Sequence, residues 1–141
     1  MHPAPSDNLA YRFPVSIKGV IWRGSEVILL KNERDEWELP GGKLELDESP
    51  EVCLQREVAE ELGLDIQVGP IVDSWVYRIA PGVDVLIVTY GCHANPTAEI
   101  RYSSEHKALG LFDANTVETL NLPFGYRRSI AAWPPTRQSE T

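Results

Sequence analysis

The sequence predicts one α+β domain, in which helices pack on a mixed or mostly antiparallel β-sheet. Three observations favour this class. The 141 residues suit a single domain, and they contain no internal repeat and no linker. The composition, with 43% hydrophobic and 24% charged residues, is typical of globular proteins. Short apolar segments separated by turn residues dominate the chain, and three stretches carry helix-start signals.

The first third of the chain predicts three strands and a hairpin. The first strand shows apolar alternation, and Arg23, Gly24 and Ser25 form the hairpin turn that follows it. The second strand is apolar at every position, so we expect it to be buried on both faces. The third is short and is expected to end at the proline and two glycines of residues 40–42. These strands are expected over residues 13–17 with 20–22, 27–30, and 37–39.

A helix is expected from Pro50 to Leu62, because this segment carries clear start and stop signals. Ser49 is suited to the N-cap, Pro50 to the first helical position, and Gly63 to a left-handed cap after the last turn. We expect one side of this helix to pack on the sheet through Val52, Val58, Ala59 and Leu62.

The second half of the chain predicts further strands and two more helices. A turn at Pro81 and Gly82 joins two of the strands. One helix is expected to begin at residues 113–115, and the last is expected to begin within 122–126 and to end at Pro134 and Pro135. The domain is expected to comprise residues 1–141, with flexible ends over about 1–10 and 134–141. The strands are expected over 66–68, 71–79, 83–92 and 108–112.

Net charge excludes some classes of partner. Thirteen basic against 21 acidic residues give a formal charge of −8, with an isoelectric point near 4.8. This argues against binding a nucleic-acid polymer or acting as a basic membrane-surface module. No segment is apolar for long enough to cross a membrane, and the N-terminus lacks the features of a signal peptide. With only two cysteines, outside any disulfide framework, we expect a cytoplasmic protein.

The acidity is concentrated in one stretch. Residues 33–65 contain twelve acidic and three basic residues, a net of −9, while the rest of the chain sums to +1. Within this stretch Glu57, Glu60 and Glu61 lie on one face of the predicted helix, within one turn. Only Arg56 lies close enough to offset their repulsion. Hard divalent cations such as Mg²⁺ neutralise such carboxylates well and bridge to substrate phosphates.

At this point the sequence resembles a known motif. Residues 42–64 are similar to the box of the Nudix hydrolases: Gly, five residues, Glu, seven residues, Arg-Glu, an aliphatic residue, any residue, Glu-Glu, any residue, Gly, and an aliphatic residue. Gly41, just before the box, and Gly42, its first residue, leave room for a ligand near the backbone. Every specified position matches, namely Gly42, Glu48, Arg56, Glu57, Val58, Glu60, Glu61, Gly63 and Leu64.

The resemblance implies an α/β/α sandwich with a mixed sheet, whose box helix carries the metal site. It implies that Glu57, Glu60 and Glu61 bind Mg²⁺ or Mn²⁺, with the carbonyl of Gly41 as a further ligand. Arg56 and Glu48 are implied to pair and to hold the glutamates in place. The catalytic set is then Glu57, Glu61, Glu105, Arg56 and Glu48.

The implied activity is the cleavage of a nucleoside diphosphate linked to another moiety, by attack of water on a phosphorus. The general base stays open between Glu57 and Glu105, and Glu99 is a weaker candidate than Glu105. Nucleoside triphosphates, including damaged ones, and ADP-ribose-like nucleotide sugars are the main candidates for this small-molecule substrate. Residues 37–43 resemble the same segment in the triphosphate-cleaning branch of the family. Homodimers are common in the family as a whole, so a homodimer is possible here. A nucleotide-sensing module without catalysis is the alternative, although such modules usually lack box glutamates.

Other residues carry weaker expectations. Cys53 is expected to be a small packing residue, Trp37 to pack the helix against the sheet, and His106 to be a loop residue. A base-stacking aromatic is sought among Phe13, Trp75, Tyr77, Phe124 and Tyr126. Arginines that could hold a phosphate, although surface solvation is the simpler role for each, are Arg12, Arg78, Arg127 and Arg128.

Overall fold

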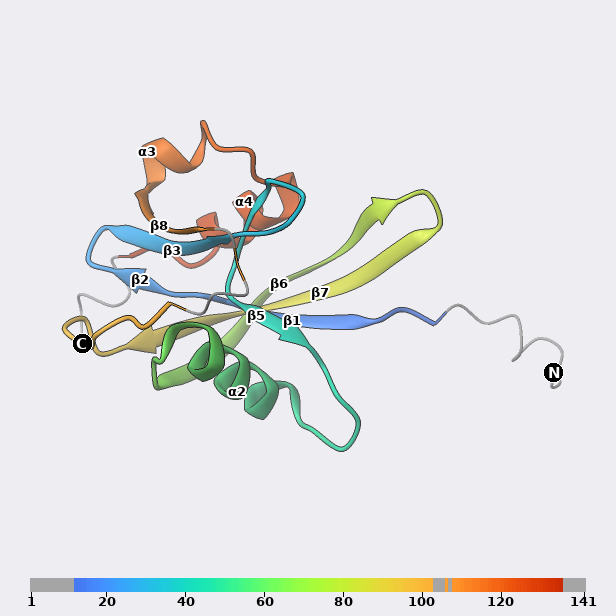
Figure 1. Cartoon of the computed structure of the whole chain (residues 1–141), viewed down its shortest axis with the longest axis horizontal. Coiled ribbons are helices and arrows are strands. Elements are labelled where there is room, and N and C mark those ends of the chain that lie inside the picture. The colour runs from blue at the N-terminus through green and yellow to red at the C-terminus, as the bar shows by residue number, and fades with distance from the viewer. Residues whose placement is uncertain (1–11, 103–105, 107, 136–141) are drawn as a thin grey trace, which may run out of the picture.

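A computed structural model of the chain describes residues 12–102, 106 and 108–135. Its first sheet has four strands in the order β5-β1-β7-β6 (Figure 1). Strands β1 and β7 are parallel, whereas β5 pairs antiparallel with β1 and β6 pairs antiparallel with β7. The predicted mixed sheet is therefore confirmed. The four strands are β1 (Val15–Val20), β5 (Gly41–Lys43), β6 (Ile66–Ala80) and β7 (Val83–Ala94).

The second sheet is built around a single central strand, β3, and all its pairs are antiparallel. Strand β8 pairs with β3 along its whole length. Strands β2 and β4 pair with opposite ends of β3, so they share its other edge. The four strands are β2 (Trp22–Arg23), β3 (Glu26–Lys31), β4 (Trp37–Glu38) and β8 (Ala108–Asp113).

Helices cover both sides of the sheets (Figure 1). Helix α2 (Pro50–Leu62) lies on one side, and α3 (Ala114–Val117) and α4 (Phe124–Ala131) lie on the other. Two hydrophobic cores result, one beneath α2 and one beneath α3 and α4. Strand β3 contributes to both, because Ile28 and Leu30 enter the α2 core whereas Val27 and Leu29 enter the other. This confirms that the strand is buried on both faces and that the layers are helix, sheet and helix.

Helix α2 has the predicted bounds and caps. The Ser49 hydroxyl accepts a hydrogen bond from the Val52 backbone N–H, and Gly63 is left-handed with its N–H donating to the Ala59 carbonyl. The predicted packing face is partly wrong, because Val52 and Ala59 are exposed. At about 100° per residue, Val52 lies roughly 200° around the helix from the buried Leu54. The buried side chains are Cys53, Leu54, Val58, Glu61 and Leu62.

Strand β6 is one continuous edge strand where two strands, 66–68 and 71–79, are expected. Its pairing with β7 shifts register between Val68 and Ile71 and again between Ile71 and Asp73. Pro70 lies in the first irregularity. Because an edge strand need not donate every backbone N–H, a bulge accommodates the proline without ending the strand.

Two expectations around the glycine pair are corrected. Residues 41–43 do not simply end a strand but form β5, which pairs with β1 at the edge of the first sheet. Trp37 does not pack α2 against the sheet. Its ring meets Phe112 edge-on, with centroids 4.9 Å apart, and it packs against the core beneath α3 and α4. Side chains two residues apart in extended backbone point to the same face. Trp37 therefore lies on the same side as Leu39, which enters the core beneath α3 and α4.

Trp133, near the end of the described residues, binds the backbone of β7. Its indole N–H donates to the Cys92 carbonyl at 3.2 Å, and its carbonyl accepts from the indole of Trp22. The ring lies against Gly91, where an added Cβ would lie 2.1 Å from the Trp133 ring. Among the described residues, no helix is long and apolar enough to cross a membrane.

We expect Gly91→Ala to lower the free energy of unfolding by about 2 kcal/mol, because the new methyl group overpacks against Trp133. In a Trp133→Leu background, which has room for that methyl, the same change should cost under about 1 kcal/mol. Urea unfolding of the four proteins measures both costs. Equal costs in the two backgrounds would show that the ring does not set the limit.

Candidate active site

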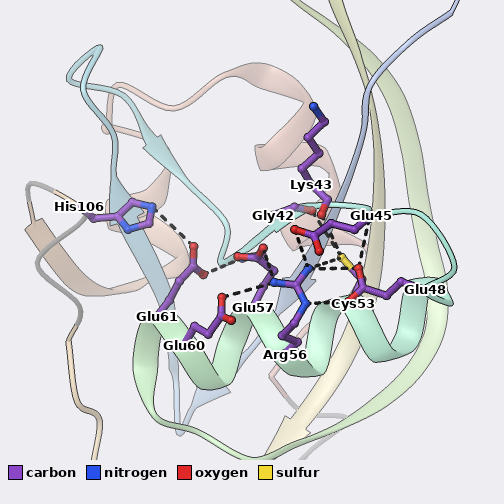
Figure 2. Close-up of polar contacts among 11 residues, drawn as sticks. Gly42, Lys43, Glu45, Glu48, Cys53, Arg56, Glu57, Glu60, Glu61 and His106 are labelled. Atoms are coloured by element: carbon purple, nitrogen blue, oxygen red, sulfur yellow. Dashed lines mark hydrogen bonds and ion pairs between the residues drawn. The ribbon is translucent and has the colours of Figure 1, made fainter.

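Three acidic residues of α2, Glu57, Glu60 and Glu61, lie where this helix faces β5 and the loop that follows it (Figure 2). Figure 2 shows Arg56 between the loop residue Glu48 and Glu57, and Glu61 directed toward His106. The spacing of Glu57 and Glu61 by four residues places both on one side of the helix, as expected. Glu61 is only 6% exposed, whereas Glu60 lies at the surface.

Arg56 is the central cation of this cluster. Its Nε and Nη2 donate to the two oxygens of Glu48 at 2.6 and 3.1 Å, which is a bidentate pair. Its Nη1 donates to Glu57 at 3.0 Å and to Glu60 at 3.4 Å. The Arg56 hydrogen bonds lower the pKa of Glu48 to about 2, and Glu48 in turn raises the pKa of Arg56. One guanidinium therefore fixes three carboxylates relative to one another.

The glycines of β5 let the backbone approach the helix carboxylates. A Cβ on Gly42 would lie 2.3 Å from the carboxyl carbon of Glu57, so no other residue fits there without moving that side chain. The Gly41 N–H donates to Glu61 Oε1 at 2.9 Å. Gly41 has a φ of 137°, and its Cβ would lie 2.0 Å from the Ile17 carbonyl oxygen. The glycine pair thus seats Glu57 and Glu61 directly against the strand.

Cys53 packs beneath this cluster, as expected. It is buried, and its Sγ lies 3.5 Å from the Lys43 carbonyl oxygen. Burial and the charge of Glu48 raise the pKa of the thiol to about 12. The cysteine is therefore a neutral packing residue rather than a nucleophile.

Glu61 is the buried carboxylate of the site. Burial raises its pKa to about 7, although the charge of Lys18 and the Gly41 hydrogen bond act in the opposite direction. A carboxylate withdrawn from water needs a cation or a proton to offset its charge. Its position beside Glu57 supplies oxygen ligands of the kind that Mg²⁺ and Mn²⁺ accept.

Three further residues, from distant parts of the chain, form a series of ion-pair contacts that ends at Glu61. His106 Nε2 lies 3.7 Å from Glu61 Oε2 and 3.4 Å from Glu38 Oε2. Lys18 Nζ lies 4.0 Å from that same Glu38 oxygen. His106 is in a bend, as expected of a loop residue, but its place between two carboxylates was not expected. No local pattern marks Lys18, Glu38 or His106, because strand pairing and a long connection bring them together.

The expected metal ligands are brought together only in part. Within the described ranges, no three His, Cys, Asp or Glu side chains converge in the manner of a metal cluster. Glu57 and Glu60 point instead to Arg56. The donor set nevertheless fits a hard divalent ion, because Glu57, Glu60 and Glu61 supply only carboxylate oxygens, and one of the three carboxylates is buried. Glu105, the other candidate base, lies outside the described residues.

The aromatic and arginine candidates fall into distinct groups. Trp75 lies within 5.2 Å of Tyr77 and 5.0 Å of Tyr126, centroid to centroid, in one aromatic cluster on the α4 side. Phe13 and Phe124 are exposed, the latter by 69%. Arginines already engaged with carboxylates or a carbonyl are Arg78 with Asp84, Arg127 with Leu122, and Arg128 with Asp73, while Arg12 is exposed.

Comparisons with known proteins agree with this geometry. A family model described as the NUDIX domain matches residues 12–133. A MutT-like protein of Streptomyces ambofaciens is 38% identical over 97 residues, covering 67% of this chain and 60% of that protein. A CTP pyrophosphohydrolase of Escherichia coli (strain K12) is 38% identical over 98 residues, covering 66% of this chain and 70% of that protein.

Solved structures agree as well. The crystal structure of a MutT NUDIX hydrolase from Burkholderia pseudomallei has a TM-score of 0.72 and 26% identity, covering 86% of this chain and 98% of that one. The chain spans 60% of the length of the Streptomyces relative, so likeness to it concerns that part alone. The family model, in contrast, covers both sheets, the three helices among the described residues, and Glu57, Glu60 and Glu61. The chain belongs to the NUDIX domain family.

Proposed function

We propose that this protein is a Mg²⁺- or Mn²⁺-dependent pyrophosphohydrolase that cleaves the diphosphate of a nucleoside diphosphate linked to another moiety. The observation that carries the proposal is the seating of Glu57 and Glu61 against the glycines of β5, with Arg56 holding Glu57 to Glu48. A buried carboxylate beside further acidic oxygens is suited to a divalent cation. Family membership supports the same activity.

In this proposal, Glu57, Glu60 and Glu61 hold the ion, with the Gly41 carbonyl as a further ligand. When bound, the ion supplies charge neutralisation for the diphosphate and a lowered pKa for a coordinated water. Arg56 and Glu48 act as positioning residues, because their bidentate pair fixes Arg56, and Arg56 fixes the Glu57 carboxylate.

The remaining step is the removal of a proton from the attacking water. A carboxylate within hydrogen-bond reach of that water is required. Glu57 and Glu105 are the two candidates for this base. The water oxygen then bonds to one phosphorus of the diphosphate, and the bond from that phosphorus to the bridging oxygen breaks. The other phosphate leaves together with the moiety attached to it.

The substrate belongs to the small soluble nucleotides. Relatives carry the names CTP pyrophosphohydrolase and 8-oxo-dGTP diphosphatase, which supports a nucleoside triphosphate, including a damaged one. Another relative, matched over 52 residues, is named as a putative ADP-ribose pyrophosphatase, so nucleotide sugars stay the second class. The net charge of −8 disfavours a nucleic-acid polymer in either case.

The test is turnover of a nucleotide panel with Mg²⁺. We expect Glu57→Gln and Glu61→Gln each to lower kcat by about 10²- to 10⁴-fold, the range for losing an essential carboxylate. Glu51→Gln, an exposed glutamate in the first turn of the same helix, should stay within about twofold. Activity that survives both cluster variants would refute the assignment. Nucleotide binding without turnover of any nucleotide would identify a sensing module instead.

Burial of Glu61 predicts a pH dependence of stability in the metal-free protein. Between the ordinary pKa of 4.5 and its folded value of about 7, Glu61 keeps its proton when folded and loses it when unfolded. The free energy of unfolding should therefore fall as pH rises through this window, by about 3 kcal/mol in total.

Urea unfolding with a chelator present, from pH 4.5 to 7.5, measures this slope. Glu61→Gln removes the titrating group, so its slope should be flatter than that of the wild type by the amount attributed to Glu61. Parallel curves for the two proteins would mean that Glu61 is not the group responsible.

A further inference from the structure

Four charged or titratable side chains form a line that ends at the glutamate cluster. Lys18 faces Glu38, Glu38 also meets His106, and His106 meets Glu61. These residues come from β1, β4, the segment before β8 and α2. All four side chains are largely shielded from solvent, and Lys18 is only 6% exposed. A lysine so deeply buried needs a reason, because removing an ammonium group from water is costly.

Glu38 alone does not account for Lys18. Their contact, Nζ to Oε2, is 4.0 Å long, which is beyond hydrogen-bonding distance. Glu38 has nearer partners, since it accepts from Asn32 Nδ2 at 3.2 Å and lies 3.4 Å from His106 Nε2. The positive charge of Lys18 is therefore only partly offset by Glu38, and it also interacts electrostatically with other groups nearby.

The helix carboxylates are among those groups. Lys18 pairs in register with Gly41 across β1 and β5, and the Gly41 N–H binds Glu61. Burial alone would lower the pKa of Lys18, but Tyr126 and the glutamates 38, 61 and 57 together raise it. In return, the charge of Lys18 works against the rise in the pKa of Glu61. Lys18 and the cluster thus interact electrostatically, and Lys18 stays charged.

We propose that Lys18 is the internal cation of the metal site, which partly neutralises the buried Glu61 and its neighbour Glu57 when no divalent ion is bound and so limits how tightly that ion binds. Glu38 reduces the effect of Lys18 on the metal site, because its negative charge lies beside the ammonium group. The inference rests on the proposed metal binding at Glu57 and Glu61. Lys18 is a positioning residue in this account, since it touches neither ion nor substrate.

Removing either partner should change metal affinity in opposite directions. Lys18→Met deletes a positive charge near the site and should tighten Mn²⁺ binding by about three- to tenfold. Glu38→Gln leaves the lysine uncompensated and should weaken Mn²⁺ binding by about the same factor. Lys18→Arg keeps the charge and should stay within about twofold of the wild type.

The experiment is calorimetric titration of the full-length protein with Mn²⁺ alone, at one fixed pH and ionic strength. Thermal unfolding with and without Mn²⁺ gives a second readout. Lys18→Met should have a lower Tm than the wild type without Mn²⁺ and a larger rise in Tm when Mn²⁺ is added. Arg78→Gln, which removes an exposed positive charge on β6, controls for net charge and should leave the Kd for Mn²⁺ unchanged.

The outcomes separate this inference from the proposed function. Opposite shifts in Kd for Lys18→Met and Glu38→Gln support it. A loss of stability in both variants with no change in Kd, or shifts of the same sign, would make Lys18 a structural partner of Glu38 and overturn it. If Lys18→Met does not fold, Glu38→Gln decides, because unchanged or tighter binding there contradicts the inference. A wild type that binds no Mn²⁺ would overturn the proposed function as well.

Discussion

Repulsion among carboxylates on one turn of a helix is the constraint around which this fold is arranged. Glu57, Glu60 and Glu61 would destabilise α2 without cations nearby. Arg56 answers part of this need, since it donates to Glu57 and Glu60 and is itself fixed by Glu48. The deepest carboxylate, that of Glu61, instead accepts a hydrogen bond from the Gly41 N–H and lies beside His106, from the bend before β8.

The sheets supply the close backbone and the further charged groups that α2 itself does not provide. Strand β5 is a short edge strand whose glycines let Glu57 and Glu61 lie against its backbone, where any side chain would displace Glu57. Where the two sheets meet, Lys18 from β1 lies 4.0 Å from Glu38 of β4, and His106 links Glu38 to Glu61 of the helix. The result is a site in which the carboxylates outnumber the cationic side chains. We infer that a divalent ion, and then a diphosphate, completes the balance.

Local signals in the sequence were enough for the helix and its motif. Ser49, Pro50 and Gly63 place the ends of α2 because caps act within a few residues, and the glutamate spacing follows from helical geometry. The Glu38–His106–Glu61 contacts could not be predicted, because they depend on strand pairing and on a connection that brings His106 back to α2. Strand β5 was missed for a similar reason: glycines that usually end a strand are required here by the close carboxylates.

The central claim is that these carboxylates bind a divalent ion. Its most direct test is an anomalous difference map from crystals of the protein soaked in Mn²⁺. The account predicts a strong peak within about 2.3 Å of carboxylate oxygens of Glu57 and Glu61. A map with no peak at this cluster, under conditions in which Mn²⁺ supports turnover, would contradict it.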